Sequence, residues 1–386
     1  MVGARRSREN LVGKTYRAAT IAGVGAVART EEYAAPELEP GAALLHTIYA
    51  EVCGTDVHLR DGRLAGVPYP LIPGHVAVGV IAEHRGVLRD IHGNVFSDGD
   101  VVTFLDVHET CNNCYECLVT KQTTRCPNRK VYGITYGARD GLLGGWSEAI
   151  WMKPGVKLLR MPQGVEPAAF IGGGCGLVTA VHAVDRAELR LGQSVVVLGA
   201  GPVGQSIVAL SSLSGAGDVI AIGGPENRLS FARRMGATAT VGLDVPPAER
   251  VAIVRERTRG RGADVVIEAS GAPDAVSQAL DLVRDGGRVV VCGQYTDRGA
   301  TSINPHLQIN RKHVEIRGCW GSDYSHFYRA LELVAQFRSK VPWIDLAEKH
   351  YALEEANDAL DAVASQQVMK AIITPNGGRP MAEARI

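Results

Sequence analysis

Four cysteines lie close together in the first third of the chain. Cys111, Cys114 and Cys117 are separated by two residues each, and Cys126 follows nine positions after Cys117. Four thiolates on one loop form a closed tetrahedral zinc site, which fixes the loop and leaves no open coordination position. The first three also match an iron–sulfur ligand run, with Pro127 after the fourth cysteine, but the last interval is too long for that run. We therefore predict a structural zinc site here.

A glycine-rich segment follows the midpoint of the chain. Gly199, Gly201 and Gly204 have the spacing G-x-G-x-x-G, with Pro202 and Val203 before the last glycine. An apolar run precedes the segment and a helical pattern follows it. In this context the glycines allow a tight turn, approach of the backbone to a pyrophosphate and packing of helix on strand, with the phosphates at the helix N-terminus. The segment predicts dinucleotide binding.

The position expected to select the cofactor carries no carboxylate. The next predicted strand ends at Ile222, and Gly223 and Gly224 follow it at the position where an acidic residue would bond the adenosine ribose hydroxyls. Its absence removes repulsion against a 2′-phosphate, and Arg228 could give such a phosphate a charge-assisted bond. Alternatively, Glu226 bonds the ribose and Arg228 is a solvated helix residue. The cofactor is therefore expected to be NAD(P), with NADP slightly favoured over NAD.

Two kinds of element must position these residues. Up to about residue 151 the chain shows short apolar runs broken by Gly, Pro and Asp, which predicts a β-rich domain. Beyond residue 171, strand-like runs alternate with helical stretches, which predicts βαβ units and a doubly wound parallel sheet. The predicted strands there are 194–198, 218–222, 264–268 and 288–292, and the predicted helices 202–214, 226–235 and 273–283. The last segment predicts amphipathic helices at 324–338 and 353–366 and a strand at 370–374.

Composition narrows the class of protein. The chain has 386 residues, enough for two domains, and equal numbers of basic and acidic residues, 41 of each. That balance argues against a nucleic-acid or anionic-membrane partner, and we find no apolar stretch approaching the roughly 20 residues of a membrane span. Residues 1–14 lack the apolar core of a secretory signal and are expected to form a disordered leader. Eight cysteines without an export signal favour metal-binding thiolates and a cytoplasmic location.

Three further segments carry residues that bind metals in other proteins. Cys53 opens Cys-Gly-Thr-Asp-Val-His, His75 follows a glycine, and Cys175 lies in a run of glycines. Taken singly, each is an ordinary core or solvated residue. Together with the cysteine and glycine motifs, in this order from 16 to 374, they resemble the zinc-containing medium-chain dehydrogenase/reductase family. The resemblance implies an α/β fold with a GroES-like β-rich catalytic domain (15–175 and 319–386) and a Rossmann doubly wound coenzyme domain (176–318).

By this resemblance, Cys53, His75 and Cys175 match the ligands of a catalytic zinc with one position open for substrate. A cysteine as third ligand, where polyol-dehydrogenase branches carry a carboxylate, indicates the general alcohol dehydrogenase branch. The remaining matches give Asp56 the role of orienting the histidine ligand. They also give Thr55 and His58 a proton relay, Thr179 a nicotinamide contact and Lys370 a place near the cofactor phosphates. One departure is Val76, because the family usually has a glutamate after the ligand histidine, behind the metal.

The activity implied is hydride transfer between an alcohol, or an aldehyde or ketone, and NAD(P). Two zinc ions per chain and a homodimer or homotetramer are implied as well. Two alternatives remain open from the residues: a zinc-free type of quinone or enoyl reductase of the same superfamily, and a non-catalytic dinucleotide-binding zinc protein. The substrate itself is not indicated by any motif.

Overall fold

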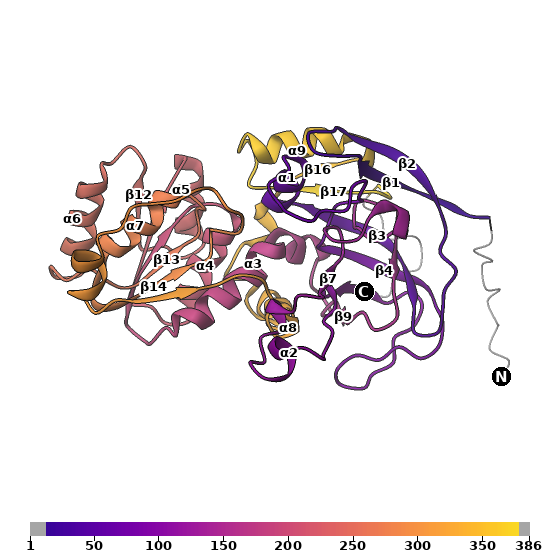
Figure 1. Ribbon diagram of the computed structural model, residues 1–386, viewed down its shortest axis with the longest axis horizontal. Helices are drawn as coiled ribbons and strands as arrows, with labels where there is room; N and C mark the ends of the chain where they lie inside the picture. Colours follow the sequence, from indigo (N-terminus) through magenta and orange to yellow (C-terminus); the bar gives the residue numbers. More distant parts are fainter. Residues whose placement is uncertain (1–12, 378–386) are drawn as a thin grey trace.

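The computed structural model describes residues 13–377, so most of the expected leader at 1–14 lies outside the described residues. The chain forms two bodies, each built on a sheet (Figure 1). A long helix, α3 (Pro167–Ala187), lies where the two bodies meet. It is long and apolar enough to span a membrane, which the sequence analysis missed, but 72% of its apolar window is buried inside the protein. We therefore describe α3 as a core helix.

One body contains a six-stranded parallel sheet in the order β12-β11-β10-β13-β14-β15. Its strands are β10 (Ser194–Leu198), β11 (Asp218–Gly223), β12 (Ala239–Gly242), β13 (Ala263–Glu268), β14 (Val283–Val291) and β15 (Glu315–Gly318). The connecting helices are α4 (Pro202–Leu213), α5 (Glu226–Arg234), α6 (Pro247–Arg257) and α7 (Pro273–Leu282). The predicted doubly wound parallel sheet is confirmed. No sequence pattern described above indicated β12, α6 or β15.

The side chains of β10 point alternately to the two faces of the sheet, and those on both faces are apolar. Val195 and Val197 pack into the core that contains α3, α4 and α5, whereas Val196 and Leu198 pack into a second core under α6 and α7. Successive side chains of a strand point to opposite faces, so an apolar run without alternation requires both faces to be covered. The run SVVVL therefore predicts a strand with helices on both sides.

The other body contains a seven-stranded, mostly antiparallel sheet. Its order is β16-β17-β3-β4-β5-β9, and β8 also pairs with β3. These strands are β3 (Ala43–Val52), β4 (Ala77–His84), β5 (Val101–Phe104), β8 (Ala149–Met152), β9 (Leu158–Arg160), β16 (Ala347–Tyr351) and β17 (Lys370–Ile373). Antiparallel pairing of β17 with β3 brings Ala371 opposite Val52. The C-terminal segment thus returns to the N-terminal body.

Smaller elements complete this body. Two pairs of short strands lie outside the main sheet: β1 (Thr15–Ile21) with β2 (Ala28–Ala34), and β6 (Val107–Glu109) with β7 (Lys130–Val131). Its helices are α1 (Gly54–Arg60), α2 (Tyr115–Leu118), α8 (Tyr324–Phe337) and α9 (Ala356–Ala364). Its single helical turns are η1 (Thr123–Arg125), η2 (Ala138–Asp140), η4 (Trp343–Leu346) and η5 (Leu353–Glu355). The short helix η3 (Pro305–Asn310) belongs to the other body, where it packs on α7.

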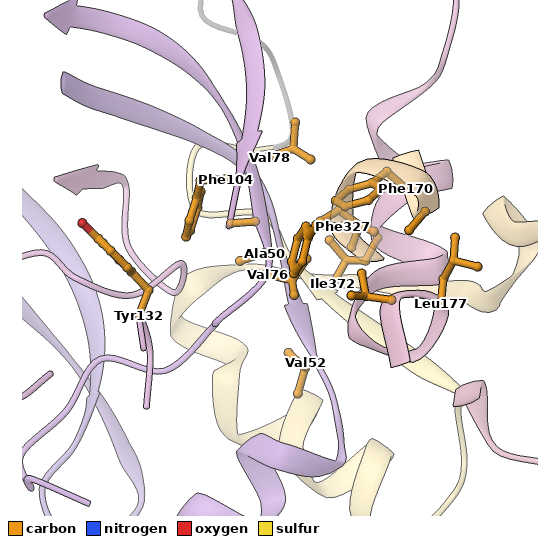
Figure 2. Packing of buried hydrophobic residues seen from close by; sticks show 14 of the residues in the cluster. Ala50, Val52, Val76, Val78, Phe104, Tyr132, Phe170, Leu177, Phe327 and Ile372 are labelled. Atoms are coloured by element: carbon orange, nitrogen blue, oxygen red, sulfur yellow. The ribbon is translucent and has the colours of Figure 1, made fainter. Parts of the chain in front are cut away.

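The two bodies share one apolar core at their junction. Figure 2 shows Phe170 of α3 beside Phe327 of α8, with Val76 and Ile372 next to them. The two phenyl rings lie 6.3 Å apart between centroids, within the range of favourable aromatic pairs. This packing holds α3 against β3 and β17, so it fixes where the residues on α3 meet those that follow β3.

Candidate active site and metal centres

The four clustered cysteines come together on a loop around α2 and η1. Their sulfur atoms all lie within 4.8 Å of one another, and the Sγ atoms of Cys126 and Cys111 are 3.6 Å apart. The backbone N–H of Asn113 and the side chain of Asn128 lower the pKa of the Cys111 thiol to about 6, which favours the thiolate that binds a metal. The loop therefore offers a four-sulfur site.

A second group of donor atoms lies at the junction of the two bodies. The side-chain donor atoms of Cys53, His75 and Cys175 lie within 4.8 Å of one another, although the residues come from three distant segments. Ligands of a tetrahedral zinc are roughly 3.5–4 Å apart, as follows from its 2.0–2.3 Å bond lengths. Two sulfurs and an imidazole nitrogen suit zinc, and a fourth position stays available. The residues present fit the metal at both sites.

Cys53 is positioned by the start of α1. It is the N-cap residue, and its Sγ accepts from the backbone N–H of Thr55 at 3.3 Å. The Asp56 carboxylate in turn accepts from the Cys53 N–H at 2.8 Å, which completes a capping box. A hydrogen bond from Cys175 lowers the pKa of Cys53 well below its usual value, against the effect of burial. Cys53 thus favours the thiolate form.

Asp56 relates to His75 differently from the prediction. Its oxygens accept from backbone N–H groups, of Cys53 and, at 3.4 Å, of Gly74. Within the described part of the chain, Nδ1 of His75 has no hydrogen-bond partner. Burial alone would lower the pKa of His75, but the charges of Cys53 and Asp56 outweigh it and raise the pKa to about 10. Asp56 therefore bonds the backbone and not the ring, and it holds the loops that carry two of the donors.

Cys175 follows a break in α3. Gly174 has φ 47° and ψ −144°, so the helix is interrupted one residue before the cysteine. The Cys175 N–H donates to Oε2 of Glu51 at 2.8 Å, and its Sγ lies 3.0 Å from Oε1 of the same carboxylate. Lys370 donates to Glu51 Oε1 at 2.7 Å and is fully buried.

The position of Lys370 corrects a sequence expectation. We expected it near the cofactor phosphates, but its ammonium group pairs with Glu51 behind Cys175 and has no exposed surface. A buried cation is held by its partner because losing that partner would leave an uncompensated charge. Lys370 therefore cannot reach a phosphate in this arrangement.

The glycine loop has the geometry expected for binding a dinucleotide. Gly199 has φ 117°, and a Cβ there would lie 2.8 Å from Ala269. A Cβ at Gly204 would lie 1.9 Å from the Gly199 carbonyl oxygen, so only glycine allows α4 to pack so closely on β10. A Cβ at Gly201 would meet no atom of the described residues within 4 Å, so only a ligand would require glycine there.

Arg228 lies on α5 after the loop that contains Gly223 and Gly224. It is 8% exposed, and its Nη2 donates to the main-chain oxygen of Val368 at 3.1 Å. Burial lowers the pKa of Arg228. The guanidinium group is thus engaged within the protein, which weakens its assignment to a 2′-phosphate.

One cavity of about 330 Å³ joins the candidate metal site to the glycine loop. It is lined by the predicted residues Cys53, Thr55, His58, His75, Cys175, Thr179, Gly201, Pro202 and Val203. Arg228 and Lys370 are not among its lining residues. The predicted catalytic-metal and relay residues and one part of the glycine loop are therefore brought to one space, where a small molecule could meet both a metal and a dinucleotide. Gly199, Gly204, Gly223 and Gly224 do not line this cavity.

Several lining residues were not identified from the sequence. Aromatic and charged members of this set are Asp106, Arg129, Tyr295, Trp320 and Phe327, and Glu51 belongs to it as well. Tyr295 stacks on Trp320 with ring centroids 5.7 Å apart. The guanidinium carbon of Arg129 lies 4.7 Å from the centroid of the Trp320 ring. Glu51 alone carried a signal, because a charged residue interrupts an apolar strand two positions before Cys53. Phe327 lies on α8 and the others lie on loops, and no local pattern encodes their contacts with the cavity.

Comparison with known proteins follows the same division of the chain. Residues 39–163 match the family described as alcohol dehydrogenase GroES-like domain, and residues 202–336 match zinc-binding dehydrogenase. The chain is 33% identical to 5-exo-hydroxycamphor dehydrogenase of Pseudomonas putida, over 89% of this chain and 95% of that protein. It is 30% identical to L-threonine 3-dehydrogenase of Bacillus subtilis, over 88% of this chain and 93% of that one.

Solved structures are similar over nearly the full length. An alcohol dehydrogenase from Thermotoga maritima superimposes with a TM-score of 0.90 at 31% identity, covering 94% of this chain and all of the other. A Sinorhizobium meliloti protein solved with bound NADP superimposes with a TM-score of 0.83 at 26% identity, covering 94% and 100%. The similarity therefore includes both bodies and the junction between them.

Proposed function

The chain belongs to the zinc-dependent medium-chain dehydrogenase/reductase family and is an NAD(P)-dependent alcohol dehydrogenase, and we propose that its reaction takes place in the junction cavity. One observation carries this proposal: a single cavity is lined by Cys53, His75 and Cys175 on one side and by Gly201 on the other. We assign the three donors to a catalytic zinc and the four-cysteine loop to a structural zinc, two ions per chain.

When bound, zinc supplies a Lewis acid that lowers the pKa of an alcohol hydroxyl, and NAD(P) supplies the hydride acceptor. The chain's own residues then have to carry the proton away. Thr55 and His58 line the cavity, and the His58 ring is only half-buried. Burial and the nearby Arg63 lower the pKa of His58, so the ring is neutral near pH 7 and able to accept a proton. We assign this relay to Thr55 and His58.

Other residues position the metal donors and the cofactor. Asp56 holds the backbone on both sides of the donor set, through the N–H groups of Cys53 and Gly74. Thr179 of α3 lines the cavity next to Pro202 and Val203, where we place the nicotinamide. Apolar side chains such as Val107, Val131 and Ile134 line much of the cavity, which suits a small alcohol or carbonyl compound.

For the cofactor we propose NADP over NAD, on the turn after β11. Gly223 and Gly224 carry no carboxylate that would repel a 2′-phosphate. The structural neighbour from Sinorhizobium meliloti contains NADP, which is consistent with this choice. The proposal no longer depends on Arg228, because that guanidinium is bonded to Val368.

We also propose a cytoplasmic homodimer or homotetramer with a catalytic domain (15–175 and 319–386) and a coenzyme domain (176–318). All eight cysteines are free thiols, which fits a reducing compartment. The strands of the parallel sheet lie between Ser194 and Gly318, which supports the domain division.

A spectrophotometric screen tests the proposed reaction. Primary, secondary and cyclic alcohols, aldehydes and ketones would be offered with NAD and NADP, and with their reduced forms. We expect cofactor reduction by at least one alcohol and oxidation by the matching carbonyl compound. Turnover of quinones or enoyl thioesters alone would favour a zinc-free type of reductase. Cofactor binding without turnover of any compound would favour the non-catalytic alternative.

A further inference from the structure

A buried ion pair lies directly behind the cysteine on α3. Glu51 of β3 is 1% exposed and Lys370 of β17 is fully buried, and their charged groups are 2.7 Å apart. Glu51 also contacts Cys175 twice, through the backbone N–H at 2.8 Å and through Sγ at 3.0 Å. The Sγ contact is a hydrogen bond from the thiol, so it is lost when Cys175 binds a metal as a thiolate. The bond from the backbone N–H remains, and through it the carboxylate holds the main chain of a proposed metal ligand.

The break in α3 is shaped around this pair. Interruption of the helix at Gly174 leaves the Gly173 carbonyl and the Cys175 N–H for other partners, and Lys370 and Glu51 bond them. A Cβ at Gly174 would lie 2.0 Å from Oε2 of Glu51 and 2.5 Å from Nζ of Lys370. Glycine is thus required at 174 by the ion pair as well as by its backbone conformation.

The residue after the histidine donor carries no charge. Val76 is 1% exposed, lines the same cavity as Glu51, and packs in the apolar core of the junction (Figure 2). The main chains of the two positions are adjacent, because the Glu51 N–H donates to the Val76 carbonyl at 3.0 Å. Beside the donor set, the segment that contains Val76 therefore carries no carboxylate, and the adjacent segment carries that of Glu51.

The geometry points to Glu51, backed by Lys370, as the positioning residue that fixes Cys175 toward the metal and supplies behind it the carboxylate that position 76 lacks. This inference rests on the metal site of the proposed function. Two apolar side chains of similar volume at positions 51 and 370 would fill the same space without the cost of desolvating two charges. The pair instead gives Cys175 a directed bond through its backbone N–H, while Lys370 balances the carboxylate charge beside the thiolate. Residues that bond metal ligands typically change metal affinity by about 10–100-fold.

Zinc release provides a readout separate from catalysis. The full-length enzyme would be mixed with a chromophoric chelator, and the four-cysteine site would serve as a reference within each molecule. For Glu51→Gln, which keeps the shape but removes the charge opposite Lys370, we expect release from the Cys53 site to be at least about tenfold faster. Release from the four-cysteine site should not change. The matched control Asp264→Asn, which removes a partly buried carboxylate of the parallel sheet, should change neither rate.

A transplant tests the equivalence of the two positions. Glu51→Gln combined with Val76→Glu should slow the release again, and failure to do so would overturn that equivalence. If Glu51→Gln does not fold, Glu51→Met with Lys370→Met removes both charges together and is measured in the same way. Release rates within twofold of wild type in the folded variant would overturn the inference and leave the pair a purely structural element. Only one zinc in the wild-type chain would instead contradict the catalytic metal site of the proposed function.

Discussion

The indole Nε1 of Trp146 donates a 2.9 Å hydrogen bond to the main-chain oxygen of Glu51, two residues before Cys53. Trp146 also packs against the segment before His75, because a Cβ at Gly74 would lie 2.5 Å from the Trp146 Cδ1 atom. Trp146 has no exposed surface. One buried side chain therefore sets the distance between the segments that bring two of the metal donors together.

Trp146→Phe should uncouple these two segments. The Glu51 carbonyl would lose its bond to the indole, and a buried acceptor left without that bond costs about 1–3 kcal/mol. We expect a lower melting temperature and a lower kcat with little change in affinity for the cofactor, because the glycine loop lies elsewhere. Thermal denaturation and steady-state kinetics check both effects. Wild-type stability and kcat would show that Trp146 does not position the site.

Cys114→Ser should act mainly on stability. None of the four clustered cysteines lines the junction cavity. Loss of this zinc should lower the melting temperature by more than about 4 °C, which corresponds to roughly 1–2 kcal/mol for a protein of this size. The kcat of the molecules that remain folded should stay near wild type. A loss of kcat at unchanged melting temperature would contradict a structural role.

Gly224→Asp should shift the cofactor preference from NADP toward NAD. A Cβ at Gly224 meets only Leu243, at 3.6 and 3.7 Å, so a side chain fits there. At Gly223 a Cβ would lie 2.8 Å from Ala200, so the same change there would distort the glycine loop. A carboxylate near the ribose should weaken NADP binding by about tenfold or more through repulsion of the 2′-phosphate. Titration of both cofactors checks this, with Gly224→Ala as the steric control, and equal effects on both cofactors would contradict it.

Asp264 should make the parallel sheet sensitive to acid. Partial burial works to raise the pKa of this carboxyl, but bonds from Ser194 and Arg284 outweigh it and lower the pKa. A lowered pKa in the folded state means that the stabilisation is complete above about pH 4, the unfolded value, and is lost as the pH falls toward the folded value. Asp264→Asn should therefore be less stable at pH 7 and lose less stability on acidification. Melting temperatures from pH 7 to pH 3 that run parallel in both proteins would contradict this.

Local patterns in the sequence predicted the elements whose signal is contained in a short window. The apolar run of β10 and the spacing of the glycines and clustered cysteines each specify a structure within about twenty residues. The strand 218–222, the helix 226–235 and the strand 370–374 were likewise found close to β11, α5 and β17. These features depend on the period of apolar residues and on backbone geometry, which nearby residues determine.

Contacts between distant segments were not predictable in the same way. Glu51 and Lys370 are 319 residues apart in the chain, and nothing near either residue indicates the other. Lys370 was for that reason assigned to the cofactor phosphates. Asp56 was given the role of orienting His75, and in the structure its carboxylate accepts from backbone N–H groups. The grouping of Cys53, His75 and Cys175 was accessible only through resemblance to a family, because no spacing rule connects them.

The most direct test of the catalytic zinc site is the turnover of Cys175→Ala, measured with zinc content and cofactor binding on the same sample. We predict that the variant folds, binds NAD(P) with wild-type affinity, keeps the zinc of the four-cysteine loop and reduces no cofactor in the presence of an alcohol that wild type oxidises. Turnover near the wild-type rate would contradict the assignment of Cys53, His75 and Cys175 to a catalytic zinc.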